Sequence, residues 1–411
     1  MLELALHIAF RPRAMAGFRK LAVSVSALLT LVALKIYIDM TYTFPSGTGP
    51  LLGTIQTPRN TLILLEALRG QENESIFALR DLAQKLRKVV IESDALWNSK
   101  ELHLLNHKGL KAWTCQKEKQ HLKDPNTYPD SLKDFLLYGG ECRNQEILID
   151  QPNKCPLNKT FLLLAIKSSP QNFAQRQAVR DSWGKERDYG GHQVRLVFLL
   201  GVAPGPDLSS LLWYENKHSQ DLLQWAFLDT FFNLTLKDQL FLGWARVRCP
   251  GASYILKGDD DVFVHMPEIV HQLSLMDRKN PHALYMGDVV MDANPYRDPR
   301  SKYFIPSSYY TGSYPPYAGG GGYVFSGIFI HWLYLVSQLV VPFPIDDVYT
   351  GMCFMALGVS PLKHPGFRTF HVPGDKSTAK CPKQQLLLVH RKTPQEMLKM
   401  WGEPMANMAP C

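Results

Sequence analysis

The sequence predicts an α/β fold in which a mostly parallel sheet is flanked by helices, and three observations support this prediction. After about residue 155, short apolar runs alternate with amphipathic stretches. The apolar runs are nearly continuous, as in strands that are buried on both faces of a parallel sheet. The composition, with 45% hydrophobic and 20% charged residues, is that of a globular protein.

The first element is an apolar run over residues 21–38, close to the roughly 20 residues that a helix needs to cross a bilayer. Arg11, Arg19 and Lys20 precede this run, and positive charge is typical of the cytoplasmic side of a membrane helix. A cleaved signal peptide and a buried core helix are the alternatives, but no clear cleavage site follows the run. We therefore expect residues 1–20 to be a cytoplasmic tail and residues 21–38 to be a transmembrane signal anchor.

Residues 39–150 are predicted to form a stem and an N-terminal subregion. Pro and Gly are frequent between residues 39 and 60, which is typical of a linker. Apolar residues then recur at helical spacing over residues 75–93, so we expect a helix there. The pattern leaves open whether this helix packs on the main domain or on a second chain.

Residues 151–411 are predicted to form the main domain, in which strands and helices alternate. The predicted elements, in order, are strand 160–168, helix 173–184, strand 193–201, helix 236–248 and strand 253–258. Ligands of such sheets bind beyond the carboxyl ends of the strands. Residues that directly follow a strand are therefore candidates for a functional site.

The charges argue against a nucleic-acid-binding protein, and the cysteines indicate an oxidising compartment. The net charge of +8 comes from scattered Lys and Arg, and no nucleic-acid-binding motif occurs, so nucleic acid is not an expected partner. All seven Cys follow the apolar run, and N-glycosylation sequons occur at Asn73, Asn158 and Asn233, as in the oxidising secretory pathway. We expect a disulfide between Cys353 and Cys381, which share one C-terminal region, and an odd thiol elsewhere.

Three consecutive carboxylates, Asp259 to Asp261, follow the third predicted strand. They repel one another and each prefers water, so this position is unfavourable unless a cation or hydrogen-bond donors compensate. Oxygen ligands of this kind suit Mg²⁺ or Mn²⁺. An acidic turn, or the cap of a helix that starts near Pro267, explains the same residues, and spacing alone does not separate the two interpretations.

Three further features have both a functional and a structural interpretation. Arg176 and Arg180 share one helical face and can meet diphosphate oxygens or the carboxylates of Asp181 or Glu186. The four glycines at 319–322 form a hinge or let the backbone approach a sugar closely. Rings that can stack on sugars precede them, namely Tyr303, Tyr309, Tyr310, Tyr314 and Tyr317.

Six segments together resemble the inverting β1,3-glycosyltransferases of glycosyltransferase family 31, and they run in that family's order over about 250 residues. These segments are RQAVRDSWG at 176, NLTLKD at 233, YILKGDDDVFV at 254, YPPYAGGGGYVFSG at 314, PIDDVYTGMC at 344 and GFRTF at 366. Within the family, Ala318 in the glycine-rich segment and the PIDDVYTGMC segment are similar to the β1,3-N-acetylglucosaminyltransferases.

The resemblance implies a GT-A fold, with a Rossmann-like sheet, for residues 151–411. It implies transfer of N-acetylglucosamine from UDP-N-acetylglucosamine, in β1,3 linkage and with inversion, to galactose-terminated glycans of glycoproteins or glycolipids, as in poly-N-acetyllactosamine extension. It also implies a single-pass type II protein of the Golgi membrane with a lumenal catalytic domain. A homo- or hetero-oligomer with other transferases is compatible with such a protein.

The family's Asp-x-Asp motif maps onto Asp259, Asp260 and Asp261, which implies that Asp259 and Asp261 hold Mn²⁺, or else Mg²⁺. A His after the catalytic base is a further ligand in related enzymes, and His371 is the candidate. His364 is a neighbouring alternative, and an ordinary loop histidine explains the same position.

The base that takes the proton from the attacking 3-hydroxyl maps onto Asp347, with Asp346 in support, although either Asp also suits a helix N-cap. Donor-binding candidates implied by the resemblance are Ile166, Lys167, Ser168, Arg176, Arg180, Asp221, Lys257, Asp259 and Asp260, with Lys237 a weaker one. Acceptor-binding candidates are Lys302, Tyr303, Tyr317, Gly320, Gly321 and Gly322.

Two other functions remain open at this point. A β1,3-galactosyltransferase would use UDP-galactose on the same scaffold. An inactive family member would bind or escort another transferase, but the expected acidic residues are all present, which argues against this alternative.

Overall fold

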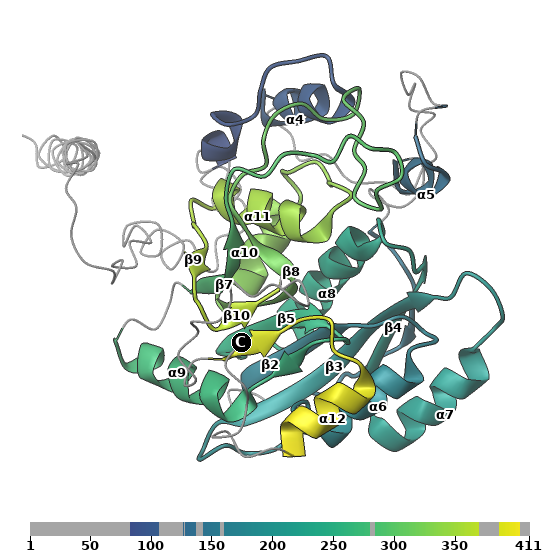
Figure 1. The fold of residues 1–411 in the computed structure, drawn as a ribbon, viewed down its shortest axis with the longest axis vertical. Coiled ribbons are helices and arrows are strands. Elements are labelled where there is room, and N and C mark those ends of the chain that lie inside the picture. Colours follow the sequence, from purple (N-terminus) through teal and green to yellow (C-terminus); the bar gives the residue numbers. More distant parts are fainter. Residues whose placement is uncertain are drawn as a thin grey trace, which may run out of the picture. The chain divides into compact units, whose positions relative to one another are not determined.

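The computed structural model describes residues 83–106, 126, 128–136, 143–156, 160–279, 284–369 and 386–402 (Figure 1). All of them belong to one compact unit that runs from residue 55 to residue 411. The predicted anchor at 21–38 lies outside the described residues, and among those that are described no helix is long and apolar enough to span a bilayer.

A mixed sheet of eight strands forms the centre of this unit, in the order β1-β4-β3-β2-β5-β8-β7-β9. Strands β4, β3, β2 and β5 are parallel to their neighbours in that series, whereas β8 runs antiparallel to both β5 and β7. The strands are β1 (Ile147–Ile149), β2 (Thr160–Lys167), β3 (Gln193–Val202), β4 (Leu222–Leu228), β5 (Tyr254–Asp259), β7 (Tyr285–Val290), β8 (Tyr317–Ser326) and β9 (Leu362–Lys363). The predicted parallel arrangement is therefore confirmed for β2 to β5, and the whole sheet is mixed.

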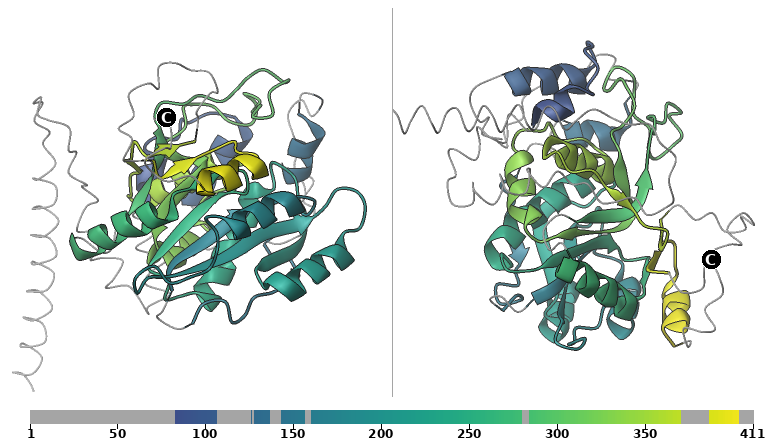
Figure 2. Two further views of the ribbon diagram at one scale, coloured as in Figure 1. Left: turned by 60° about the horizontal axis from the view of Figure 1, so that its bottom comes forward. Right: turned by 90° about the vertical axis from the view of Figure 1, so that its left-hand side faces the viewer.

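The apolar strands are buried because helices cover both faces of the sheet. Along β2, Leu163 and Ala165 enter one apolar core, while Leu162, Leu164 and Ile166 enter the other. Helices α8, α10 and α11 cover the first face, and α6, α7, α9 and α12 cover the second (Figures 1 and 2). The helices are α4 (Leu96–Asn106), α5 (Asp130–Asp134), α6 (Phe173–Asp181), α7 (Ser209–Ser219), α8 (Leu234–Arg248), α9 (Met266–Lys279), α10 (Phe329–Val336), α11 (Asp346–Ala356) and α12 (Pro394–Gly402).

A second, small sheet brings the C-terminal part of the chain to the end of β5. It contains β10 (Phe367–Arg368), β11 (Leu388–Val389) and β6 (Phe263–Val264), with β11 antiparallel to β6. Residue 390 is thereby placed beside the aspartates that precede β6.

The helix expected at 75–93 is shorter at its C-terminal end than predicted. The described part is helical through Arg87 and then turns. Val89, Val90 and Ile91 follow, and β-branched residues in succession are poor helix formers. Ala83 and Leu86 are buried in the same core as the sheet, so this end of the helix packs on the main domain.

One expectation about covalent modification is wrong. Cys353 on α11 is a free and buried thiol, so it is not bonded to the expected partner Cys381, which lies outside the described residues. The disulfide in the described residues joins Cys155, just before β2, to Cys249 at the end of α8. The sequon residue Asn233 is buried, and its Nδ2 donates to the carbonyl of Leu228.

Candidate functional site

The carboxyl ends of β2 and β5 lie side by side and bring the predicted charged residues together. Lys167 and Asp259 are paired in register, and Lys167 Nζ lies 3.1 Å from Asp259 Oδ1. The same ammonium lies 2.5 Å from Oδ2 of Asp346, the first residue of α11. Lys167 therefore connects the Asp-x-Asp segment with the predicted base segment.

A group able to hold a metal ion stands at this edge. Ligand atoms of Asp259, Asp261 and His390 all lie within 4.8 Å of one another. His390 Nε2 is 3.1 Å from Asp261 Oδ1 and 3.6 Å from Asp259 Oδ2. The two carboxylates suit a divalent ion such as Mg²⁺ or Mn²⁺, and the imidazole fits Mg²⁺ less well because that ion takes oxygen ligands.

His390 is held in the orientation that a metal ligand requires. Its Nδ1 donates to the carbonyl of Thr369 at 3.0 Å, which directs Nε2 toward the carboxylates. Metal-binding histidines characteristically use their second nitrogen in this way. Burial lowers the pKa of His390, but the hydrogen bond and charge of Asp261 and the charge of Asp259 outweigh it and raise the pKa above its usual value.

The predicted ligand His371 lies outside the described residues, so its assignment stays a prediction. His364 is not part of the group described above; its Nδ1 accepts from the backbone N–H of Gly366. His390 was missed by the sequence reasoning. The available signal was its place directly after the short apolar run 386–389, where a strand end was to be expected.

Asp260 has a different environment from its two neighbours. Its Oδ2 accepts from Ser168 Oγ at 2.6 Å and from Asn172 Nδ2 at 3.0 Å. Burial, only partly offset by these two bonds, raises its pKa to about 6. Asp260 thus fastens the loop after β2 to the end of β5, while Asp259 and Asp261 form the metal-type group.

The two predicted base residues also differ from each other. Asp346 is buried, and although burial raises its pKa, the charge and hydrogen bond of Lys167 outweigh it and hold the pKa below its usual value. Asp347 is partly exposed; its Oδ2 accepts from the N–H of Gly320 and its Oδ1 from the N–H of Val348. Burial and the negative charge of Asp346 raise the pKa of Asp347 to about 7. Asp347 is therefore suited to accept a proton near neutral pH.

The four glycines Gly319 to Gly322 do not form a hinge, because they lie inside strand β8. A Cβ at Gly320 would lie 3.3 Å from Asp347 Oδ2, and one at Gly321 would lie 2.7 Å from the ring of His390. The strand lacks side chains where the protein's own catalytic candidates approach it. Asp347 and His390 thus reach adjacent positions of one strand.

The two arginines of α6 are engaged within the protein. Arg176 is fully buried, and its donors bind Glu215, Ser168 Oγ and the carbonyls of Ser169 and Pro170. These bonds use all five N–H groups of the guanidinium, which leaves none for a diphosphate. Arg176 therefore shapes the loop that carries Ser168, and its expected contact with the donor is disfavoured by this geometry.

Other residues predicted to bind the sugar-nucleotide donor also form ion pairs or hydrogen bonds within the protein. Arg180 binds Asp221 at 2.8 Å and Glu215 at 2.6 Å, neither of which is the Asp181 or Glu186 considered from the sequence. The buried Lys237 binds Asp229 and the carbonyl of Ser168, Lys257 pairs with Asp238, and the Ile166 side chain is in the core. Of the donor-binding candidates, Asp259 is the one whose carboxylate joins the metal-type group.

The aromatic cluster proposed for the acceptor is largely core. Tyr309, Tyr310 and Tyr314 are buried and pack around Phe343, so their rings are not free to stack on a sugar. Tyr317 is also mostly covered. The remaining candidates lie beside one another in a second group, where Lys302 stands over the rings of Tyr303 and Phe231, and the exposed Tyr296 lies 6.0 Å from Tyr303.

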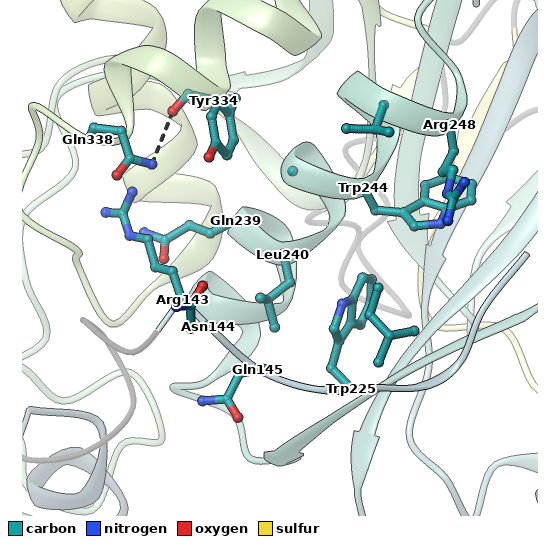
Figure 3. Close-up of a pocket in the computed structure, with 13 residues that line it drawn as sticks. Arg143, Asn144, Gln145, Trp225, Gln239, Leu240, Trp244, Arg248, Tyr334 and Gln338 are labelled. Carbon is teal, nitrogen blue, oxygen red and sulfur yellow. Dashed lines mark hydrogen bonds between the residues drawn. The ribbon is translucent and has the colours of Figure 1, made fainter. Parts of the chain in front are cut away.

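A separate groove of about 500 Å³ lies between α8, α10 and the segment before β1 (Figure 3). Trp225, Trp244 and Tyr334 form part of its wall. Gln239 in its lining donates to the hydroxyl of Tyr349 on α11 at 3.0 Å. None of the residues predicted for the site lines this groove.

Comparisons with known proteins match a large part of this chain. The family model described as galactosyltransferase matches residues 174–365, which include the aspartates of both segments. N-acetyllactosaminide β-1,3-N-acetylglucosaminyltransferase 2 of Mus musculus is 50% identical over 284 residues, 68% of this chain and 71% of that protein. UDP-GlcNAc:βGal β-1,3-N-acetylglucosaminyltransferase 8 of Homo sapiens is 37% identical over 409 residues, 93% of this chain and 97% of that protein.

A third relative, the acetylgalactosaminyl-O-glycosyl-glycoprotein β-1,3-N-acetylglucosaminyltransferase of Homo sapiens, is 43% identical over 286 residues, 66% of this chain and 73% of that protein. Among solved structures, apo mouse xyloside xylosyltransferase 1 aligns at a TM-score of 0.30 and 10% identity over 56% of this chain and 97% of that chain. That likeness is too weak to support any statement about this fold.

Proposed function

The chain belongs to the galactosyltransferase family, and from this premise we propose that it transfers N-acetylglucosamine from UDP-N-acetylglucosamine, in β1,3 linkage, to galactose-terminated glycans. The acceptors would be glycoproteins or glycolipids. The names of the relatives support the donor and the linkage, and the geometry of the site supports the chemistry.

One observation carries the proposal. The metal-type group and the base segment share one ammonium, because Lys167 Nζ lies 3.1 Å from Asp259 Oδ1 and 2.5 Å from Oδ2 of Asp346, the neighbour of Asp347. A transferase that uses a sugar nucleotide needs both groups near one sugar, one beside the diphosphate and one beside the attacking hydroxyl. A solvated acidic turn would not explain why an imidazole is directed at two of the aspartates.

The residues divide the work as follows. Asp259, Asp261 and His390 would hold Mn²⁺, which when bound neutralises charge on the diphosphate of the donor. Asp347 accepts the proton of the acceptor 3-hydroxyl, since its pKa of about 7 combines basicity with a usable ionised fraction. Asp346 stays ionised through Lys167 and keeps the pKa of Asp347 high.

A donor comparison tests the proposal. The purified full chain is given radiolabelled UDP-N-acetylglucosamine or UDP-galactose, with Mn²⁺ and a lactose-type acceptor. We expect label from the N-acetylglucosamine donor to appear in the acceptor. Consumption of UDP-galactose alone would identify a galactosyltransferase, and no UDP release with any galactose-terminated acceptor would favour an inactive binding partner.

We further propose that residues 21–38 anchor the protein in the Golgi membrane with the catalytic domain in the lumen. The apolar run, its basic flank and the disulfide between Cys155 and Cys249 support this topology. Protease treatment of sealed Golgi vesicles should leave the catalytic domain intact until detergent is added. Digestion before detergent would place the domain on the cytoplasmic side.

A further inference from the structure

The segment predicted as stem and N-terminal subregion contacts the chain that leads into the glycine strand. The backbone N–H groups of Leu96 and Trp97 donate to the carbonyls of Ser308 and Tyr309 at 2.9 and 2.8 Å. Asn98 exchanges two hydrogen bonds with the backbone of Thr311 through its side-chain amide. Helix α4 is thus joined to the loop that precedes β8.

The same helix holds the chain that leads into the base segment. Trp97 Nε1 donates to the carbonyl of Val341 at 3.0 Å, and Glu101 Oε2 accepts from the N–H of Val341 at 2.6 Å. Both backbone polar groups of Val341 are therefore bound by side chains of α4. The Trp97 ring also packs edge-on against Phe343 at 5.8 Å.

The position of Val341 is passed on to α11 through a short, stiff connection. Pro342 and Pro344 follow Val341, and proline fixes its own φ and has no N–H to offer a neighbouring element. α11 then begins with Asp346 and Asp347. The bonds to Val341 consequently fix the point from which the first turn of α11 starts.

If the side chain at position 101 only filled space in the core, an apolar residue would stabilise the fold better than Glu101. Its side chain is fully buried, burial raises its pKa to about 8, and within the described residues its Oε1 has no hydrogen-bond partner. A buried polar atom without a partner destabilises a protein. The bond from Val341 is the specific contribution that the carboxyl group makes.

We propose that Trp97 and Glu101 are positioning residues for the transfer reaction, because they hold Val341 and thereby set Asp347 against Gly320. This inference rests on the function proposed for Asp347. The metal-type group depends on β5 and on the segment around β11, so it is not held by these bonds.

Kinetics of three variants of the full chain test this inference. Glu101→Leu should lower kcat at least about tenfold, since small displacements of a reacting group have large effects, and should leave the KM for UDP-N-acetylglucosamine unchanged. Glu101→Gln keeps an acceptor for the Val341 N–H, so the kcat of this variant should be close to that of the parent. Glu92→Leu makes the same substitution at an exposed position of the same segment and should have no effect.

Hydrogen exchange separates this inference from the proposed function. Glu101→Leu should speed exchange in residues 339–349 and leave residues 257–265 unchanged, whether or not the parent transfers N-acetylglucosamine. Should Glu101→Leu fail to fold, Trp97→Phe removes the Nε1–H donor together with part of the buried indole and keeps an aromatic ring at this position. Hydrogen exchange at the parental rate in residues 339–349 of a folded variant would overturn the positioning role. Equal losses of kcat and of the affinity for UDP would also overturn it.

Discussion

Asp346 and Asp347 are neighbours in the chain, yet their carboxyl groups have opposite properties. Lys167 keeps Asp346 ionised, and the resulting negative charge adds to burial in raising the pKa of Asp347 to about 7. The resemblance to the family implied that Asp347 is the base and that Asp346 supports it. The reason for the difference lies in Lys167, which is distant in sequence and is also a predicted donor-binding residue.

Asp347→Asn should lower kcat about 100-fold or more, because general-base catalysis contributes on this order. The affinity for UDP in the presence of Mn²⁺ should change little, because Asp347 is not part of the metal-type group. Transfer rates and calorimetric UDP binding measure the two effects. A parental kcat in this variant would remove Asp347 as the base.

The pH dependence of kcat should show an acid limb with a midpoint near pH 7, since the ionised form of Asp347 is required. Asp346→Asn removes the like charge, so the pKa of Asp347 falls and the midpoint moves to lower pH. Profiles of both proteins between pH 5 and 8 check this. An unmoved midpoint would show that another group limits the acid side.

His390→Ala should raise the Mn²⁺ concentration for half-maximal activity at least about tenfold, as expected when a ligand is lost. His371→Ala is the matched comparison, since that residue was the ligand predicted from the sequence. Manganese titration of both variants separates the two histidines. A larger loss in His371→Ala would reverse the assignment.

At the scale of elements, the site is formed where strand ends and one helix start meet. Buried strands β2 and β5 could be predicted because they are apolar over their length. Strand β8 was not predicted, since four glycines have no strand pattern. Strand β11 was missed because it has only two residues, although it delivers His390 to the site.

Gly321→Ala tests the role of the bare strand, because its new Cβ would lie 2.7 Å from the ring of His390. We expect weaker Mn²⁺ binding with a folded protein. Gly402→Ala is the control, since nothing lies within 4 Å of its Cβ position. Unchanged Mn²⁺ binding in Gly321→Ala would mean that His390 can move without loss.

At the scale of the whole molecule, the sheet joins the parallel strands β4, β3, β2 and β5 to the antiparallel series β5, β8 and β7, and β5 belongs to both. Strands β2, β3 and β5 and helices α6 and α8 followed from hydrophobic patterns, whereas β4 and α7 were not predicted. The close packing of α4 on the loops before β8 and α11 could not be predicted, because those contacts join residues more than 200 positions apart and depend on single side chains. In the same way, the sequence did not show that the rings of Tyr309, Tyr310 and Tyr314 are buried in the core.

The disulfide between Cys155 and Cys249 spans a sequence separation of 94 residues and ties the entry to β2 to the end of α8. Replacing both cysteines by Ser should lower the free energy of unfolding by about 2–5 kcal/mol. Denaturant unfolding of the oxidised proteins measures this. Equal midpoints and slopes for variant and parent would show that the bond does not stabilise the fold.

The most direct test of the central claim is the structure of the reaction product. The full chain is incubated with UDP-N-acetylglucosamine, Mn²⁺ and a galactose-terminated oligosaccharide, and the product is examined by NMR. We expect N-acetylglucosamine attached to the 3-hydroxyl of galactose with a β anomeric coupling, and no such product from Asp347→Asn. An α linkage, attachment at another hydroxyl, or product formation by Asp347→Asn at the parental rate would contradict this expectation.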